Sequence, residues 1–295
     1  MKKIIITGAS GLLGKEVLKK LKRLNEYEVY AVTTKKEHLA DFLSFNIVEA
    51  DLTDAFQRKK IMEIIQPEIM IHLAWNQENA DFRMSETNLQ WLEISMDLLQ
   101  LFEKAGGKKL LFAGSSSEYD GSEGIFAESV DVVPKSLYGL CKKTFNEFAK
   151  EYCKVRGIAY IGMRFFTIYG KGDSHSFGAI PYAVRQLSLN KEIICNSPET
   201  TRDYIFVEDA ANVLLQLLKH DFCGIVNVAS GTARSMQNVF DTIGRVTGKE
   251  NLVKISTSPV AGTKFEADIS LLKNLGIIGY YSDFEQNIQN VIKNV

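Results

Sequence analysis

The chain has 295 residues, long enough for one large domain or for a domain with a smaller cap. Its 35 basic residues nearly balance its 36 acidic residues, so no basic surplus points to nucleic acid, and no apolar run is long enough to span a bilayer. The four cysteines lack the paired spacing of a zinc site or a disulfide framework. We therefore expect a cytoplasmic protein with reduced thiols and no bound metal.

The first predicted strand, residues 4–7, is a short β-branched run without charge, which is typical of a buried parallel strand. It ends at a glycine-rich turn, and an amphipathic helix begins near Gly11. Three glycines spaced three apart permit a tight turn, a close approach of pyrophosphate, and close packing of helix on strand. Any tight turn can use glycine, but this trio after an N-terminal strand favours a dinucleotide held by the amides at the helix start. The loop residues expected to contact it are Gly8, Ser10, Gly11, Leu12 and Gly14.

The second predicted strand, residues 28–33, leads into two threonines and two lysines at positions 33–36. Folds that bind NAD usually place an acidic residue here for the ribose 2′-hydroxyl. Hydroxyls and lysines would instead suit the 2′-phosphate of NADP, and the alternative is a solvated, charged loop. We expect NADP as cofactor, with NAD as the other option, and contacts from Thr33 and Lys35.

Two more strands are predicted over residues 45–52 and 68–75, with a helix over residues 55–65 between them. Asp51 can accept a hydrogen bond from the adenine amino group, or it can cap the following helix. His72 in the fourth strand is expected to be packed. A long helix over residues 85–105 carries an apolar stripe that belongs to the core or to a dimer interface.

The fifth predicted strand, residues 109–114, delivers three serines to the edge where ligands bind in open α/β sheets. Downstream, Tyr138 and Lys142 lie one helical turn apart if a helix begins at the tyrosine. An ammonium beside a phenol lowers the pKa of the phenol, which would make Tyr138 a general acid or base near neutral pH.

Together these motifs resemble those of an extended short-chain dehydrogenase/reductase of the NAD(P)-dependent epimerase/dehydratase group, which acts mostly on nucleotide sugars. The resemblance covers nearly the whole chain. It implies an α/β fold, a Rossmann-like doubly wound parallel sheet with a smaller C-terminal substrate cap. Residues 1–166 would bind the dinucleotide and residues 167–295 would mostly form the cap, with about 203–229 returning to the sheet. It also implies a homodimer.

The resemblance assigns roles to particular residues. Ser115, Tyr138 and Lys142 fall on the catalytic positions. The cofactor contacts that it implies beyond the glycine-rich loop are Asp51, Leu52, Leu73, Ala74, Asn88, Tyr138 and Lys142. The substrate contacts that it implies are Ser116, Ser117, Thr167 and Arg202, the arginine for the diphosphate.

Some positions depart from the pattern of this group. Thr167 stands where many relatives have an asparagine that contacts the nucleotide sugar. Ser116 and Ser117 stand where 4,6-dehydratases carry an Asp–Glu pair. Fucose-synthase-type enzymes use a cysteine and a histidine, whose places resemble Ser117 and Gly172, and nearby His175 is expected to be a loop residue.

The C-terminal third is predicted to hold helices over residues 180–189, 209–218, 235–247 and 283–293, with a strand over 225–228. We expect NADP(H)-dependent reduction of a nucleotide-activated 4-keto-6-deoxysugar, with Tyr138 as the acid. One alternative is an NAD(P)-dependent nucleotide-sugar 4-epimerase. The other is a non-catalytic dinucleotide sensor, against which the intact serine, tyrosine and lysine argue.

Overall fold

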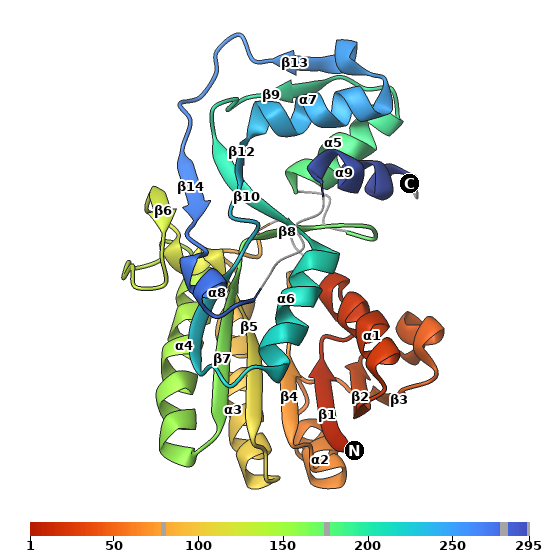
Figure 1. Cartoon of the computed structure of the whole chain (residues 1–295), viewed down its shortest axis with the longest axis vertical. Helices are drawn as coiled ribbons and strands as arrows, with labels where there is room; N and C mark the ends of the chain where they lie inside the picture. Colours follow the sequence, from red (N-terminus) through yellow and green to blue (C-terminus); the bar gives the residue numbers. More distant parts are fainter. Residues whose placement is uncertain (78–80, 174–177, 278–282, 294–295) are drawn as a thin grey trace. The chain divides into compact units, whose positions relative to one another are not determined.

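The computed structural model describes residues 1–77, 81–173, 178–277 and 283–293 (Figure 1). The chain divides into two compact units. The first comprises Met1–Gly121, Asp131–Phe165 and Ala211–Val226, and the second comprises Ser122–Val130, Phe166–Ala210 and Asn227–Val295. Each unit therefore contains segments that are far apart in the sequence.

A central sheet organises the first unit. Among the described residues it has seven strands in the order β11-β7-β5-β4-β1-β2-β3. The strands are β1 (Lys2–Thr7), β2 (Tyr27–Thr33), β3 (Asn46–Glu49), β4 (Ile69–His72), β5 (Lys109–Ser115), β7 (Ala159–Phe165) and β11 (Gly224–Val228). Neighbouring strands from β3 to β7 pair in parallel. The direction of winding reverses between β1 and β4, so the ligand crevice of such a sheet is expected at the carboxyl ends of these two strands.

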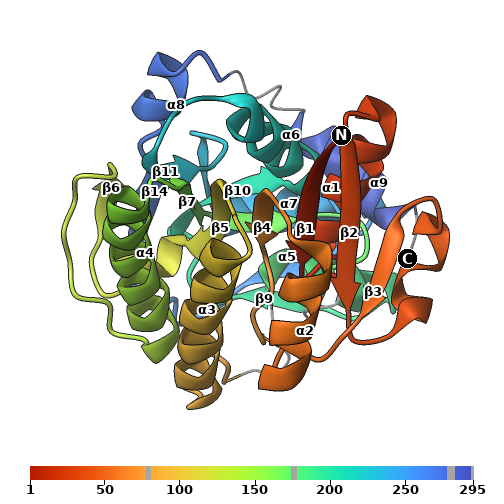
Figure 2. The ribbon, with the colours of Figure 1, turned by 90° about the horizontal axis from the view of Figure 1, so that it is seen from below.

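Helices cover both faces of this sheet. Figure 2 shows α2 (Ala55–Ile65), α3 (Thr87–Lys104) and α4 (Leu137–Arg156) on one face. Their apolar side chains pack with those of the strands in one core cluster. The other face is covered by α1 (Leu12–Leu24) and α6 (Val207–Lys219) (Figure 2). Because both faces are covered, Ile4, Ile5 and Ile6 of β1 are fully buried, which explains why the centre of this strand is apolar on both sides.

The second unit has its own small sheets and its own core. One sheet joins β12 (Ala233–Ser235), β10 (Thr201–Phe206), β14 (Lys264–Ala267) and β6 (Gly124–Phe126), and β8 (Thr167–Tyr169) also pairs with β10. A second sheet joins β13 (Val253–Ile255) and β9 (Ile193–Cys195). The helices of this unit are α5 (Ala179–Ser188), α7 (Met236–Thr247), α8 (Ser270–Asn274) and α9 (Phe284–Ile292). Aromatic and aliphatic side chains of α5, α7 and α9 form its core.

The fold class predicted from the sequence is confirmed, while the ends of several elements differ. β3 ends at Glu49 and β4 at His72, each three residues before the predicted end. The alternative that Asp51 caps α2 is wrong, because the side chain of Asp54 accepts the N–H groups of Phe56 and Gln57. Within the residues that the structure describes, no helix is long and apolar enough to cross a membrane.

Candidate active site

The glycine-rich turn between β1 and α1 owes its shape to close backbone contacts. Gly8 has φ +67°, and a Cβ there would lie 2.6 Å from the backbone nitrogen of Ala74 on the loop after β4. A Cβ at Gly14 would lie 2.3 Å from the carbonyl oxygen of Gly8. These two glycines therefore permit the turn and the packing of α1 against it.

Gly11 differs from the other two glycines because it is exposed, and among the described residues a Cβ placed there would meet the Gly8 carbonyl oxygen at 3.3 Å. It is the N-cap residue of α1, makes no side-chain cap, and is followed by a first turn without acidic residues. An uncapped helix start with an exposed glycine backbone suits an anion such as a diphosphate. The loop residues Ser10 and Leu12 are half-buried beside it. The residues present therefore fit a dinucleotide.

A buried histidine ties the ends of β1 and β4 together beneath this turn. The Ser95 hydroxyl donates to the carbonyl oxygen of Trp91, so it accepts from His72 Nε2–H at 2.9 Å. His72 Nδ1 then accepts the Thr7 hydroxyl at 2.6 Å, and Thr7 Oγ1 accepts the N–H of Ala74 at 3.3 Å. Burial lowers the pKa of His72 to about 3, and the charge of Lys142 acts in the same direction. His72 is therefore a neutral, packed residue, as predicted.

The carboxyl ends of β2 and β3 carry the residues predicted near the adenosine ribose and the base. Thr33 is buried and its hydroxyl donates to the carbonyl oxygen of Lys35 at 3.1 Å, while the side chains of Lys35 and Lys36 are exposed. The backbone N–H of Lys36 donates to Glu49 at 2.9 Å. Asp51 is exposed and its carboxylate accepts both the N–H and the hydroxyl of Thr53. Leu52 beside it is buried.

The Ser115 side chain lies beside the Tyr138 phenol and lowers its pKa. Ser115 ends β5 and caps the short helix η2 (Ser116–Tyr119), its hydroxyl oxygen accepting the N–H of Ser117 at 3.1 Å. Tyr138 lies in the first turn of α4, which Ser136 caps. Gln77 Nε2 donates to the Tyr138 hydroxyl at 2.7 Å. The structure thus brings together the predicted serine and tyrosine at the carboxyl end of the sheet.

Lys142 lies one turn further along α4 and is also buried. Its Nζ donates to the carbonyl oxygen of Ala113 at 2.7 Å and lies 3.9 Å from the centroid of the Trp75 ring. Burial lowers the pKa of Lys142 to about 7, against the charge of Glu118, which raises it.

The expectation that Lys142 brings the pKa of Tyr138 toward neutrality is wrong for this arrangement. Burial raises the pKa of Tyr138 to about 12, and the Ser115 and Gln77 side chains offset only part of this rise. Lys142 Nζ is 5.8 Å from the tyrosine ring centroid, is bonded elsewhere, and is itself partly neutral near pH 7. Tyr138 is therefore a protonated phenol at neutral pH.

Asn88 of α3, another predicted cofactor contact, bonds to residues on both sides of positions 78–80 in the segment between β4 and α3. Its side-chain oxygen accepts Trp75 Nε1–H at 2.9 Å, and its Nδ2 donates to the carbonyl oxygens of Phe82 and Ser85. The aromatic rings of Trp75 and Phe82 meet the Tyr138 ring edge-on. Leu73 and Ala74 lie at the start of this segment, half-buried and buried respectively. Asn88 thus shapes the surroundings of Tyr138.

The predicted substrate residues are divided between the two units. Ser116 and Ser117 follow Ser115 in the first unit, half-buried and buried. Thr167 in β8 and Arg202 in β10 belong to the second unit. The Arg202 guanidinium donates to the Thr201 and Thr263 carbonyl oxygens and to the Thr263 hydroxyl. His175 lies outside the described residues.

The sequence profile of the NAD-dependent epimerase/dehydratase family matches residues 4–229, about three quarters of the chain. The chain belongs to this family. The match begins in β1 and ends just after β11, so it includes the glycine-rich turn and the serine, tyrosine and lysine described above.

Individual relatives of this NAD-dependent epimerase/dehydratase family member agree with that result. A protein of Methanocaldococcus jannaschii, named as a candidate UDP-glucose 4-epimerase, is 27% identical over 257 residues, 81% of each chain. The fold is similar to that of UDP-N-acetylglucosamine 4-epimerase from Methanobrevibacter ruminantium, solved with UDP-N-acetylmuramic acid, with a TM-score of 0.85, 22% identity, and 99% and 97% of the two chains covered. It is also similar to UDP-glucose 4-epimerase from Thermus thermophilus in complex with NAD, with a TM-score of 0.84, 20% identity, and 99% and 98% covered.

Three residues of this family member surround the site without having been predicted from the sequence. Gln77 and Trp75 lie on a loop whose path follows from tertiary contacts, so no local signal points to them. Glu118 does have a signal, because a serine followed three residues later by a glutamate is the spacing of a capping box.

Proposed function

We propose that this chain transfers hydride at C4 of a nucleotide-activated sugar, and that its reaction is the NADPH-dependent reduction of a 4-keto-6-deoxysugar. The observation that carries the proposal is the placement of the Tyr138 hydroxyl, which accepts a hydrogen bond from Gln77, lies beside Ser115 and is one turn from Lys142 on α4. Reduction of a ketone needs a hydride and one proton, and this phenol is a proton donor at neutral pH. The family to which the chain belongs supports the dinucleotide.

The roles that we propose follow from the donors present. A dinucleotide held by the glycine-rich turn would supply the hydride. Tyr138 gives its proton to the carbonyl oxygen, and the Ser115 hydroxyl donates a hydrogen bond to the same oxygen. The Gln77 amide, 2.7 Å from the Tyr138 hydroxyl, stabilises the phenolate that remains. Lys142, in its protonated form, would hold the nicotinamide ribose.

Elimination of water from a hexose is not supported by these residues. It requires a carboxylic acid and a base beside the transient ketone. Ser116 and Ser117 carry only hydroxyls, and the carboxylate of the next residue, Glu118, is fully buried and bonded to Arg164. The same residues offer no thiol or imidazole for deprotonating a ring carbon. Hydride transfer with one proton is what remains.

The preference for NADP(H) is proposed from the loop after β2. Exposed Lys35 and Lys36 follow Thr33 and Thr34, and no acidic side chain lies within this run. A phosphate on the ribose would gain from such cations and hydroxyls. The glycine-rich loop would hold the diphosphate, and Asp51 and Leu52 would contact the adenine. Leu73, Ala74 and Asn88 would line the path toward the nicotinamide. Ser116, Ser117, Thr167 and Arg202 would contact the substrate.

A second candidate, nucleotide-sugar 4-epimerisation, is favoured by the relatives, which are named as UDP-sugar 4-epimerases. An epimerase would use the same serine, tyrosine and lysine to oxidise C4 and to reduce it again from the other face. It would keep its cofactor bound and consume none of it.

One experiment separates these reactions. The purified protein is given a panel of nucleotide-linked 4-keto-6-deoxysugars and parent hexoses, and NADPH absorbance and product mass are recorded together. Reduction predicts stoichiometric loss of NADPH and a product two mass units heavier than the ketone. Isomerised product without net NADPH loss would establish the epimerase instead. A keto-deoxy product made from a parent hexose would contradict both the reductase and the epimerase proposals.

We also propose that the chain forms a homodimer through α3 and α4. The two helices pack side by side on one face of the sheet (Figure 2). Leu89 on α3 and Leu140 and Val155 on α4 are exposed apolar side chains. An isologous dimer is the commonest symmetric assembly and would cover them.

A further inference from the structure

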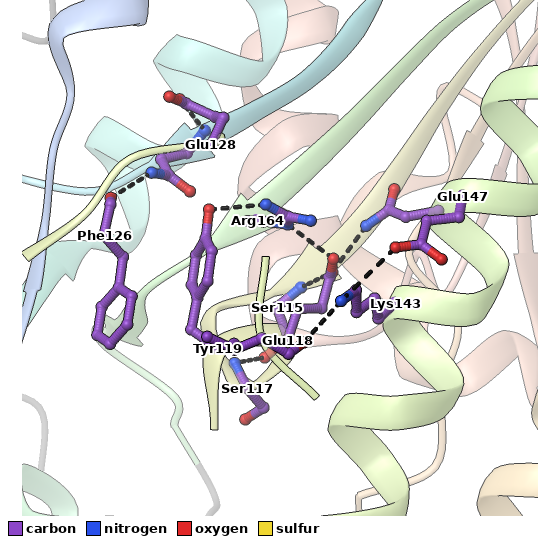
Figure 3. Close-up of polar contacts among 12 residues, drawn as sticks. Ser115, Ser117, Glu118, Tyr119, Phe126, Glu128, Lys143, Glu147 and Arg164 are labelled. Atoms are coloured by element: carbon purple, nitrogen blue, oxygen red, sulfur yellow. Dashed lines mark hydrogen bonds and ion pairs between the residues drawn. The ribbon is translucent and has the colours of Figure 1, made fainter. Parts of the chain in front are cut away.

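A buried carboxylate lies directly behind the turn that carries Ser115 (Figure 3). The Glu118 side chain is 0% exposed, and it forms an ion pair at 2.7 Å with Arg164, whose side chain is 6% exposed. A buried charge is tolerated only when it is paired and hydrogen-bonded. Glu118 Oε1 accepts the backbone N–H of Ser115 at 2.9 Å and Asn146 Nδ2–H at 2.7 Å, while Oε2 accepts Arg164 Nε–H.

Two glycines on the neighbouring strands β5 and β7 leave the space for these side chains. A Cβ at Gly114 would lie 2.6 Å from Glu118 Oε1, and a Cβ at Gly162 would lie 2.0 Å from Asn146 Oδ1. Asn146 Oδ1 also accepts the Tyr160 hydroxyl at 2.6 Å. The position of the carboxylate is therefore set by the sheet itself.

We propose that Glu118 is a positioning residue for the reaction: by accepting the backbone N–H of Ser115, it fixes the turn from which the Ser115 hydroxyl meets the reacting oxygen. This inference rests on the proposed function, in which Ser115 hydrogen-bonds the carbonyl oxygen. η2 is a four-residue 3₁₀ turn with few hydrogen bonds of its own. Its entry is held by two reciprocal bonds, from Ser117 N–H to the Ser115 hydroxyl and from Ser115 N–H to Glu118.

The neighbouring residue offers a matched control. Tyr119 belongs to the same network, since Arg164 Nη1 donates to its hydroxyl at 2.7 Å (Figure 3). Tyr119→Phe removes one hydrogen bond from Arg164 but leaves the Glu118 bond to Ser115 in place. A network that only stabilises the fold would respond to both changes, whereas a positioning role belongs to Glu118 alone.

The test combines Glu118→Gln and Tyr119→Phe with a Ser115→Ala background. Glutamine keeps the shape of the side chain but cannot accept from Ser115, Asn146 and Arg164 together. Displacing a reacting group by about 1 Å can lower kcat roughly a hundredfold, so we expect Glu118→Gln to lower kcat about ten- to a hundredfold with little change in KM. In the Ser115→Ala background the same change should have almost no further effect.

Three results would overturn the proposal. They are a Glu118→Gln enzyme with normal kcat, an equal loss of kcat in Tyr119→Phe, and a Glu118→Gln effect that is as large in the Ser115→Ala background as in the unmodified enzyme. If Glu118→Gln does not fold, Glu118→Asp replaces it, because aspartate keeps the charge but is one methylene shorter and falls short of the Ser115 N–H.

A second measurement keeps this inference separate from the proposed function. Amide hydrogen exchange at Ser115 reports directly on the bond that its N–H makes. We expect exchange at this amide to be at least about tenfold faster in Glu118→Gln and unchanged in Tyr119→Phe. Faster exchange in an enzyme that reduces no sugar on the panel would support the role of Glu118 while the proposed function fails. Unchanged exchange in Glu118→Gln would overturn the role of Glu118 whatever the activity.

Discussion

Tyr138 and Lys142 lie one turn apart on α4, and burial acts on them in opposite directions. It raises the pKa of the phenol to about 12 and lowers the pKa of the ammonium to about 7. Both shifts have one cause, since burial disfavours the charged form of each group. Near pH 7 the phenol keeps its proton, while Lys142 is divided between its two forms. Tyr138 therefore begins the reaction with a proton to donate, beside a lysine that is only partly protonated. A ketone reduction needs such a proton donor.

The first prediction concerns Tyr138→Phe. The change removes the proton donor but keeps the ring that packs against Trp75 and Phe82. We expect turnover to fall by a factor of about 100 to 10,000, which is the usual contribution of a general acid. Dinucleotide affinity, measured by calorimetry, should stay near the wild-type value. If the mutant kept near-normal turnover on its true substrate, Tyr138 would not be the general acid.

The second prediction uses the pKa of Lys142. Between about pH 7 and pH 10.5 the unfolded chain keeps a proton on this lysine that the folded protein has lost. The unfolded state then binds more protons, so this lysine makes stability rise with pH across that window, by at most about 1.4 kcal/mol per pH unit.

Lys142→Met should remove this slope and should be more stable than the wild type near pH 7. Urea unfolding of both proteins at several pH values measures the difference, in which the titration of all other groups cancels. A stability difference that does not change with pH would show that Lys142 stays charged in the folded protein.

The residues of the site differ in how far the sequence reveals them. Ser115, Tyr138 and Lys142 were assigned from the family resemblance, and local spacing added only that Lys142 lies one helical turn after Tyr138. Gln77 was not assigned, because its contact with Tyr138 joins positions 61 residues apart. The pKa of Tyr138 was predicted in the wrong direction, since spacing alone shows which charges are near but not how completely the phenol is buried.

At the scale of elements, the pattern of apolar residues located the strands and helices but not all of their ends. α2 has the predicted bounds, since Asp54 caps its start and Gln66, with positive φ, ends it. β3 ends at Glu49 and β4 at His72, so the last three residues predicted for each strand lie in the following loops. Hydrophobic runs continue into such loops because the residues there are also buried, as Leu52 and Ala74 are.

The third prediction concerns the link between β1 and β4. Thr7→Val keeps the shape of the side chain but leaves His72 Nδ1 without its donor and Ala74 N–H without its acceptor. Because these groups are buried, we expect a loss of about 2 to 4 kcal/mol in the free energy of unfolding. Thermal or urea unfolding measures it, and Thr53→Val, at an exposed position, is the control. A loss below about 0.5 kcal/mol would mean that water replaces the threonine.

The fourth prediction concerns the loop after β2. The unmodified protein should bind NADPH more tightly than NADH, and Lys35→Glu with Lys36→Glu should narrow or reverse the difference. Loss of charge-assisted phosphate contacts should lower NADPH affinity by about 1.5 to 3 kcal/mol, roughly ten- to a hundredfold. NADH affinity should change much less. Equal affinities for the two cofactors in the unmodified protein would contradict the preference.

At the scale of the whole molecule, the parallel sheet was predictable, whereas the composition of the two units was not. Residues 122–130 and 131–165 follow one another in the chain, yet they belong to different units. Assignments of this kind depend on pairings such as β6 with β14, which join residues about 140 positions apart. No periodicity in a single segment contains that information.

The last prediction is the homodimer, and it depends on which apolar residues remain uncovered. On α4, Leu140 and Val155 are exposed, and half-buried Phe148 and Tyr152 lie between them along the helix. Exposed apolar residues are common on any surface, and α2 also has two, Phe56 and Ile64. What distinguishes α3 and α4 is that they also carry half-buried apolar residues packed at the margin of the core, among them Leu92, Met96, Phe148 and Tyr152. Leu89→Asp with Leu140→Asp should therefore convert a dimer into a monomer in sedimentation at micromolar concentration, while Ile64→Asp should leave it unchanged. If the unmodified chain sediments as a monomer, the homodimer proposal is wrong and the apolar residues of α3 and α4 serve only to pack the core.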